Sequence, residues 1–212
     1  NFGDWSQYFD GVDVTVSARF RGGFTFQGGT STGRTVADAC GVRANLPELS
    51  AGLGAGLAGS NVSPTSPYCR VNYGLLTQFR GLATYTVPRA DVQISGVMQS
   101  KPGPLLSANY AVRTATESTL GRPLSSGQST VTVNLLEPGS MYGNRVNQLD
   151  LRLAKLLRFG GTRTMVGVDI YNALNSLAIL TYNNTFVPGG TWLQPQSILT
   201  ARMVKFSAEF TF

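Results

Sequence analysis

One stretch near the amino terminus alternates apolar and polar residues without interruption. From Val12 to Phe20 every second residue is apolar, and the residues between them, from Asp13 to Arg21, are polar or charged. A period of two places the two kinds of side chain on opposite faces of a β-strand, whereas a helix would show a period of 3.6. The pattern therefore predicts a strand with one face toward an apolar medium and the other toward water.

Six further segments have a similar pattern, and together they predict an all-β chain. The predicted strands span residues 12–21, 24–35, 72–87, 91–100, 148–159, 163–174 and 198–212. They are longer than the roughly 5–6 residues usual in globular proteins, and they reach the roughly 9–11 residues of a tilted bilayer-spanning strand. We expect a single domain, residues 1–212, built on seven long antiparallel strands.

The connections between these strands alternate in length. A short strand-like piece at residues 129–135 is compatible with a hairpin inside one long loop. Short turns at one end of a sheet and long loops at the other are typical of an outer-membrane β-barrel, whereas soluble sheets usually have short connections at both ends. Tight turns are predicted at residues 22–23, 88–90 and 160–161, and long loops at residues 36–71, 101–144 and 176–197.

The two predicted faces of the sheet differ in charge. The polar face carries ionisable residues that protein cores rarely bury, so we expect it to line a water-filled lumen rather than a packed interior. A solvent-exposed face of a soluble sheet is the alternative. The apolar face has aromatic residues near its strand ends, as interfacial girdles require. The predicted lumen-facing charges are Asp13, Arg19, Arg80, Asp150, Arg152, Asp169, Lys205 and Glu209.

Lys155 departs from the apolar pattern of its strand, because it shares the phase of Leu153 and Leu157. A lysine at the bilayer midplane costs about 2–4 kcal/mol, and the cost falls toward the interface. Two explanations stay open: the side chain extends to the headgroups, or a β-bulge shifts the register of the strand.

The two cysteines, Cys40 and Cys69, lie in loop sequence rich in Gly, Pro and Ser, without a metal-binding or redox spacing. We expect a disulfide between them, which indicates an oxidising compartment and stabilises by roughly 3–4 kcal/mol in the loop-entropy description. Two separate thiols are the alternative.

Composition excludes several classes of function. The chain has no histidine, so Ser-His-Asp hydrolysis, Cys-His hydrolysis and ordinary zinc sites are ruled out within it. The net charge of +6 is spread along the chain without a basic run or a recognition motif, so we expect no nucleic-acid partner. No cofactor, metal ligand or catalytic residue is predicted, and a small β-barrel enzyme is a remote alternative.

Three short sequence motifs are too unspecific to indicate a function. Residues 54–59 match G-x-G-x-x-G, but no strand-turn-helix unit surrounds them, so we interpret them as loop. Residues 61–63 and 183–185 match the acceptor of N-glycosylation, which is common by chance. The first residue is not Met and no signal-peptide segment follows, so we expect a mature product or a fragment.

The carboxy terminus is more specific. Its alternate residues Val204, Phe206, Phe210 and Phe212 form an amphipathic strand with an aromatic last residue. This strand resembles the assembly signal of bacterial outer-membrane barrels. Together with residues 147–153, the stretch D-I-Y-N-A-L-N at 169–175 and residues 192–195, it is similar to the last strands of a TonB-dependent receptor. The upstream hairpins and residues 99–104 resemble Oar-type receptors, which carry an amino-terminal carboxypeptidase-regulatory-like domain.

The resemblance implies a place and a role. The parent receptor would lie in the bacterial outer membrane, where it would take up a ligand with energy from TonB. Outer-membrane lipid, the remaining barrel strands and the plug would be its partners, and TonB would act through amino-terminal parts absent from this chain. The alternative is a self-assembling extracellular or surface β-protein, whose copies pair through open sheet edges. Because seven antiparallel strands have first and last members that run the same way, we expect no closed monomeric barrel.

Overall fold

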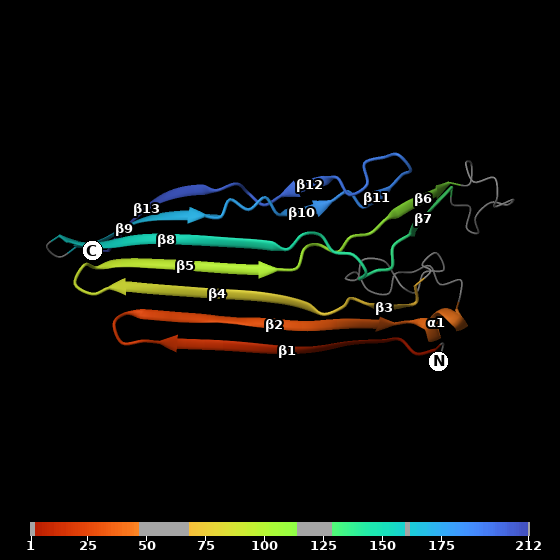
Figure 1. Cartoon of the computed structure of the whole chain (residues 1–212), viewed down its shortest axis with the longest axis horizontal. Coiled ribbons are helices and arrows are strands. Elements are labelled where there is room, and N and C mark those ends of the chain that lie inside the picture. Colours follow the sequence, from red (N-terminus) through yellow and green to blue (C-terminus); the bar gives the residue numbers. More distant parts are fainter. Residues whose placement is uncertain (1–2, 47–67, 114–128, 160–161, 212) are drawn as a thin grey trace.

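The chain folds into an all-β structure dominated by one antiparallel sheet (Figure 1). The computed structural model describes residues 3–46, 68–113, 129–159 and 162–211. Seven strands lie side by side in the sheet, and an eighth, β3 (Arg70–Asn72), pairs with the end of β2. The seven are β1 (Ser6–Arg19), β2 (Phe24–Asp38), β4 (Leu76–Val87), β5 (Val92–Lys101), β8 (Val146–Phe159), β9 (Thr162–Tyr171) and β13 (Met203–Thr211).

These seven strands are the ones that the sequence pattern predicts, and they follow one another in sequence order. Each pairs antiparallel with its neighbour, from β1 at one edge to β13 at the other. β1 and β13 consequently run in the same direction. The sheet is not closed into a barrel, and within the described ranges the outer edges of β1 and β13 pair with no strand. The open sheet agrees with the expectation from the odd strand number.

The short connections gather at one end of the sheet, on the left in Figure 1. Between β1 and β2, Gly23 has a φ of 89°, a conformation that glycine adopts without steric cost. The backbone N–H of Thr86 donates to the carbonyl of Gly23 at 2.9 Å, and that of Leu156 donates to the carbonyl of Asp91 at 2.9 Å. Neighbouring turns are therefore bonded to the strands beside them. We call this region the turn end; it comprises residues 19–24, 86–92, 155–159, 162–165 and 207–211.

The opposite end, which we call the loop end, contains short elements of its own. The helix α1 (Cys40–Asn45) follows β2, and β10 (Ile179–Tyr182) pairs with β12 (Pro195–Ile198). A three-stranded sheet joins β6 (Asn109–Arg113), β7 (Thr130–Asn134) and β11 (Thr185–Phe186). β7 corresponds to the strand-like piece at residues 129–135. It pairs antiparallel with β6, so the hairpin that the sequence allowed is present, although the sequence did not single out the residues of β6.

Two predicted strands begin several residues later in the structure than in the sequence pattern. Residues 72–87 yield a strand that begins only at Leu76, because Gly74 has a φ of 69° and its N–H donates to the Asn72 side chain. Residues 198–212 yield a strand that begins at Met203. Ahead of it, the N–H of Arg202 donates to the side chain of Asn175, and Ile198 belongs to β12.

Neither face of the large sheet is covered by a second layer among the described residues. Most buried apolar side chains, such as Val36, Val71 and Leu106, belong to the loop end or the strands beside it. Along the sheet itself, large apolar side chains stay exposed, and Phe206 reaches 77%. The long strands are therefore held by their hydrogen bonds and by same-face contacts, not by a conventional core.

Lys155 lies on the apolar side of β8 in an unbroken register. Val92 on β5 and Val166 on β9 are directly opposite it, and the pairing continues on both sides without a shift. The β-bulge explanation is therefore wrong, and extension of the side chain to the interface stays a prediction.

Candidate functional site

The register of the strands places all eight predicted lumen-facing charges on one face of the sheet. Directly opposed residues of an antiparallel pair share a face, so the rows can be followed from strand to strand. One row contains Arg19, Arg152, Asp169 and Lys205, and another contains Arg80 and Gln99. Asp13, Asp150 and Glu209 occupy the same phase of their strands. We call this side the polar face.

The opposite side, which we call the apolar face, carries the residues of the proposed assembly signal. Val204, Phe206 and Phe210 on β13 have exposed side chains and lie opposite Ile170, Val168 and Thr164, respectively. The last member of that signal, Phe212, lies outside the described residues. The apolar face continues across the sheet through large exposed residues, namely Val12, Val14, Val16, Phe79, Tyr85, Ile94, Leu151, Leu153 and Phe159.

One ion pair and a series of side-chain hydrogen bonds organise the polar face. Arg152 Nη1 lies 3.2 Å from Asp169 Oδ1, and Asp169 is 6% exposed. On β8, Gln148 donates to Asp150 at 3.0 Å and accepts a 2.8 Å hydrogen bond from Gln99 on β5. Among the described residues, Arg152–Asp169 is the only ion pair within the predicted set of eight charges. The amide side chains were not identified as site residues from the sequence.

A hollow of about 770 Å³ lies along β1, β2, β4 and β5. Its polar-face lining combines one cation, one carboxylate, amides and hydroxyls, with Leu82 and Val97 as apolar neighbours. This set of hydrogen-bond donors and acceptors suits a polar, hydroxyl-rich or anionic ligand rather than an apolar one. The polar members are Asp13, Thr15, Gln27, Ser31, Gln78, Arg80 and Gln99.

Arg80 stands near the centre of this hollow, opposite Gln99 on one side and Gly29 on the other. A Cβ at Gly29 would lie 2.4 Å from the carbonyl oxygen of Val14, so only glycine fits there without a backbone shift. Gly29 thus adds no side chain to the lining of the hollow at this register position. In the part of the chain that the structure describes, Arg80 has no carboxylate within 4.0 Å.

The D-I-Y-N-A-L-N stretch ends β9 and connects the polar face to the loop end. Asn172 has a φ of 49° and is 2% exposed. Its backbone N–H donates to Asp150 at 2.8 Å, and its side-chain amide donates to the carbonyls of Ser176 and Thr200 at 3.0 and 2.9 Å. The predicted strand 163–174 therefore ends at Tyr171, because Asn172 leaves the extended conformation.

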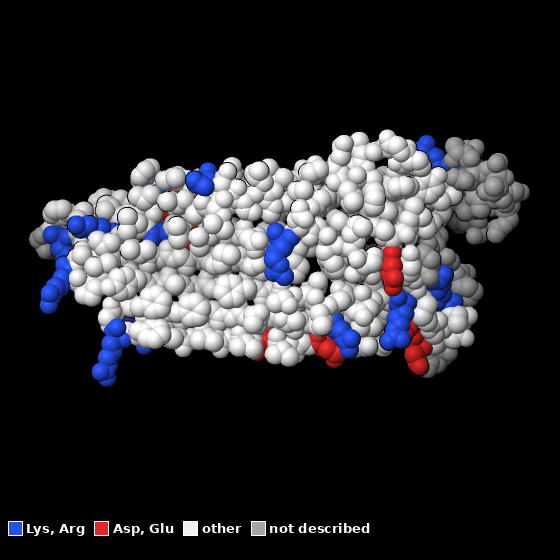
Figure 2. Space-filling view, viewed as in Figure 1, with Lys and Arg blue, Asp and Glu red and all other residues white. Residues whose placement is uncertain are grey.

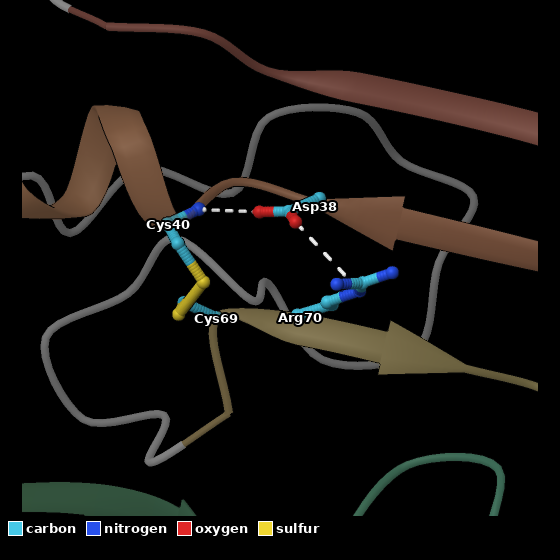
Figure 3. Close-up of a disulfide and its surroundings, with 4 residues drawn as sticks. All are labelled: Asp38, Cys40, Cys69 and Arg70. Carbon is cyan, nitrogen blue, oxygen red and sulfur yellow. Dashed lines mark hydrogen bonds and ion pairs between the residues drawn. A yellow bond between two sulfur atoms is a disulfide. The ribbon is translucent and has the colours of Figure 1, made fainter.

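The predicted disulfide between Cys40 and Cys69 is present, with the Cα atoms 4.8 Å apart (Figure 3). Asp38 lies beside it: one carboxylate oxygen accepts the N–H of Cys40 at 3.0 Å, and the other lies 3.7 Å from Arg70 Nε. The N–H of Ala39 also donates to the carbonyl of Cys69 at 3.0 Å. These contacts fasten α1 and β3 to the end of β2.

An aromatic cluster, which the sequence did not predict, orders part of the loop end. Phe186 packs edge-on against Tyr110 and Trp192, with ring centroids 6.4 and 5.6 Å away. The indole N–H of Trp192 donates to the carbonyl of Ser107 at 2.9 Å. The cluster thus joins two long loops that are distant in the sequence.

Two partly buried tyrosines, Tyr73 and Tyr142, are joined by a hydrogen bond. The Tyr142 hydroxyl donates to the carbonyl of Tyr73 at 2.8 Å. Burial raises the pKa of both phenols above the usual 10.0, and for Tyr142 the neighbouring Tyr73 raises the pKa further.

Some expected features fall outside what the structure describes. The G-x-G-x-x-G match at residues 54–59, the acceptor match at 61–63 and the turn glycines 160–161 lie in undescribed segments. Within the described ranges, no three His, Cys, Asp or Glu residues gather as a metal site, and no helix is long and apolar enough to cross a membrane.

Comparisons with known proteins assign no family to the chain. No family model, no curated protein and no solved structure matches it.

Proposed function

We propose that this chain is the carboxy-terminal barrel segment of a TonB-dependent outer-membrane receptor of the Oar-like type. The proposal rests above all on the contrast between the two uncovered faces of one sheet. Val12 at 67%, Leu153 at 52% and Phe206 at 77% exposure belong to the apolar face, and the eight predicted lumen-facing charges lie on the reverse side. Soluble monomers rarely expose apolar patches of more than a few hundred Å². Hydrocarbon would cover this surface without an energetic penalty.

The sheet dimensions support the same role. The strands of the large sheet have the length of tilted spanning strands, and short turns are confined to one end. The loop end would then face outward, where no cytosolic reductant opens the Cys40–Cys69 disulfide. The hollow around Arg80 would lie on the lumen side, on the route of a ligand that the loops first capture.

In this proposal the parent receptor supplies the parts that the sheet lacks. Its other strands would pair with the open edges of β1 and β13, because lipid offers no partner for exposed backbone groups. Its amino-terminal parts would supply the plug and the contact with TonB, which provides the energy for uptake.

Cell fractionation combined with peptide mass spectrometry tests the proposal. Peptides of this chain should be recovered from the outer-membrane fraction, within a polypeptide several times longer than 212 residues. Recovery of those peptides only from the cytoplasm would contradict it.

The same open edges favour a second candidate, a secreted or surface β-protein that assembles from copies of this chain. Unpaired edges are ready templates for strand addition. If this second candidate is correct, the fractionation experiment should recover a polypeptide of the length of this chain. It should occur in large assemblies that dissociate on denaturation to the single 212-residue chain.

A further inference from the structure

Basic residues predominate at the turn end. Figure 2 shows Lys and Arg side chains projecting from this end of the molecule, on the left of the view. Two acidic residues, Asp91 and Glu209, belong to the same region. The basic residues there are Arg19, Arg21, Arg89, Lys155, Arg158 and Arg163.

Among the described residues, most of these basic side chains have no ion pair. Asp91 pairs with Arg158 at 3.2 Å, and among the described residues no other ion pair forms at the turn end. At the loop end, by contrast, Arg34 is paired with Asp10 and Arg70 with Asp38.

Two of the turn-end cations lie directly opposite each other. Arg158 on β8 and Arg163 on β9 are register partners and share the polar face. Like charges at opposed positions destabilise a strand pair unless an anion lies nearby. Asp91 reaches only Arg158, so the pair retains an excess positive charge.

Aromatic side chains of the apolar face lie at or next to the same end of the sheet as these cations. The rings of Phe20 and Phe24 are 5.6 Å apart, and Tyr85, Phe159 and Phe210 are 40%, 66% and 61% exposed. Aromatic side chains next to basic ones are typical of the level at which a protein meets lipid headgroups. A soluble polyanion would satisfy the arginines but would leave the aromatic rings in water, so a lipid surface fits both features.

We infer that the turn end binds the phosphate headgroups of anionic glycerophospholipids in the leaflet that the turns face. The inference rests on the proposed function, because it requires that the sheet cross a bilayer. It adds a partner and an orientation: basic side chains of the turns contact the headgroup phosphates, and the adjacent rings lie at the top of the acyl chains.

Lipid selectivity of the reconstituted protein tests this inference. The polypeptide recovered with this chain in the fractionation experiment, with all its strands, is inserted in phosphatidylcholine bilayers that contain a trace of either spin-labelled phosphatidylglycerol or spin-labelled phosphatidylcholine. Electron paramagnetic resonance then measures the motionally restricted fraction of each label, which gives their relative association constant. We expect phosphatidylglycerol to be preferred, and the preference to fall as salt is raised.

A matched pair of double variants locates the effect. Arg21→Gln with Arg89→Gln removes two exposed turn-end charges, and Lys101→Gln with Arg202→Gln removes two exposed charges at the loop end. A basic residue at an anionic membrane surface changes association by about fivefold. We therefore expect the turn-end variant to lose most of the preference, by up to that factor per charge, and the loop-end variant to keep it.

The outcomes separate this inference from the proposed function. Restricted lipid without a preference for phosphatidylglycerol, or a preference that both variants reduce equally, would overturn the inference and leave the membrane location intact. The second result would indicate general attraction of a basic protein for anions. Absence of any motionally restricted lipid would instead refute the proposed function.

Discussion

Lys205 on β13 lies directly opposite Asp169 on β9, so that this nearly buried carboxylate stands between two cations. The second cation is Arg152 on β8, whose guanidinium lies 3.2 Å from the carboxylate. The arrangement joins three neighbouring strands near the carboxy-terminal edge of the sheet. Asp169 thus supplies the negative charge between Arg152 and Lys205, which occupy the same row of the polar face.

Removal of that charge should destabilise the sheet. We expect Asp169→Asn to lower the free energy of unfolding by about 1–3 kcal/mol, since it leaves Arg152 without its ion-pair partner. Asp13→Asn is the matched control: this carboxylate is exposed, has no ion pair among the described residues and should change stability by less than about 0.5 kcal/mol. Denaturant unfolding of the detergent-solubilised chain gives both values. Equal effects of the two substitutions would contradict the role of Asp169.

The disulfide should stabilise the loop end locally. Thiol labelling of the denatured, unreduced chain should find no free cysteine, and Cys40→Ser with Cys69→Ser should cost about 3–4 kcal/mol by the loop-entropy argument. Because the bond fastens α1 and β3, we expect faster hydrogen exchange at Val71 in the double variant and unchanged exchange at Val97 on β5. Two labelled thiols in the wild-type chain would refute the bond.

The sequence predicted the large sheet because its strands obey one strong local rule. Alternation fixes which residues of a strand share a face, and this was enough to place Asp13, Arg80 and Asp169 together on the polar face. The odd number of strands likewise predicted an open sheet. Both inferences use only the period of the apolar residues and the number of strands, and these depend little on tertiary contacts.

The loop end was predicted poorly because its elements depend on distant partners. β6 is short, and its pairing with β7 and β11 brings together segments that no local pattern relates. The break before β13 also has a distant cause, since the side chain of Asn175 accepts the N–H of Arg202. The hydrogen bond from the Gln99 side chain on β5 to the Gln148 side chain on β8 follows from the register, which the sequence pattern does not supply.

Asn172 should be sensitive to substitution for two separable reasons. Both Asn172→Ala and Asn172→Gly remove the side-chain hydrogen bonds. Alanine, which has a Cβ, must in addition adopt the left-handed φ of 49°, whereas glycine adopts it without strain. We expect both variants to be less stable, with alanine worse than glycine by about 1 kcal/mol. Denaturant unfolding measures the difference. Alanine and glycine variants of equal stability would show that the left-handed conformation is not maintained in solution.

Stability should decline in strongly alkaline solution because of Tyr73 and Tyr142. Burial raises the pKa of both phenols above 10.0 in the folded chain, so the folded state favours the neutral forms. This contribution is present below the unfolded pKa of about 10 and is lost as the pH rises through the folded pKa. Absorbance at the tyrosinate band should show two late-titrating groups, and Tyr142→Phe should remove one of them. Titration of all tyrosines at the usual pKa would contradict this expectation.

The opposite environments of Val14 and Thr15 provide the most direct test of the proposed membrane location. These neighbours on β1 project to opposite faces, Val14 opposite Thr30 on the apolar face and Thr15 opposite Gly29 on the polar face. In reconstituted bilayers, a spin label at Val14 should collide more with oxygen, which concentrates in hydrocarbon, than with a water-soluble nickel complex. A label at Thr15 should show the reverse ratio.

Labels at Val204 and Lys205 repeat the comparison at the other edge of the sheet, where the same reversal is expected. Equal accessibility at Val14 and Thr15 would mean that both faces of β1 meet the same medium, and the proposed barrel wall would be wrong. A reversal at β1 without one at β13 would mean that the apolar face of β13 meets protein rather than lipid, as it would in an assembly of copies through that edge.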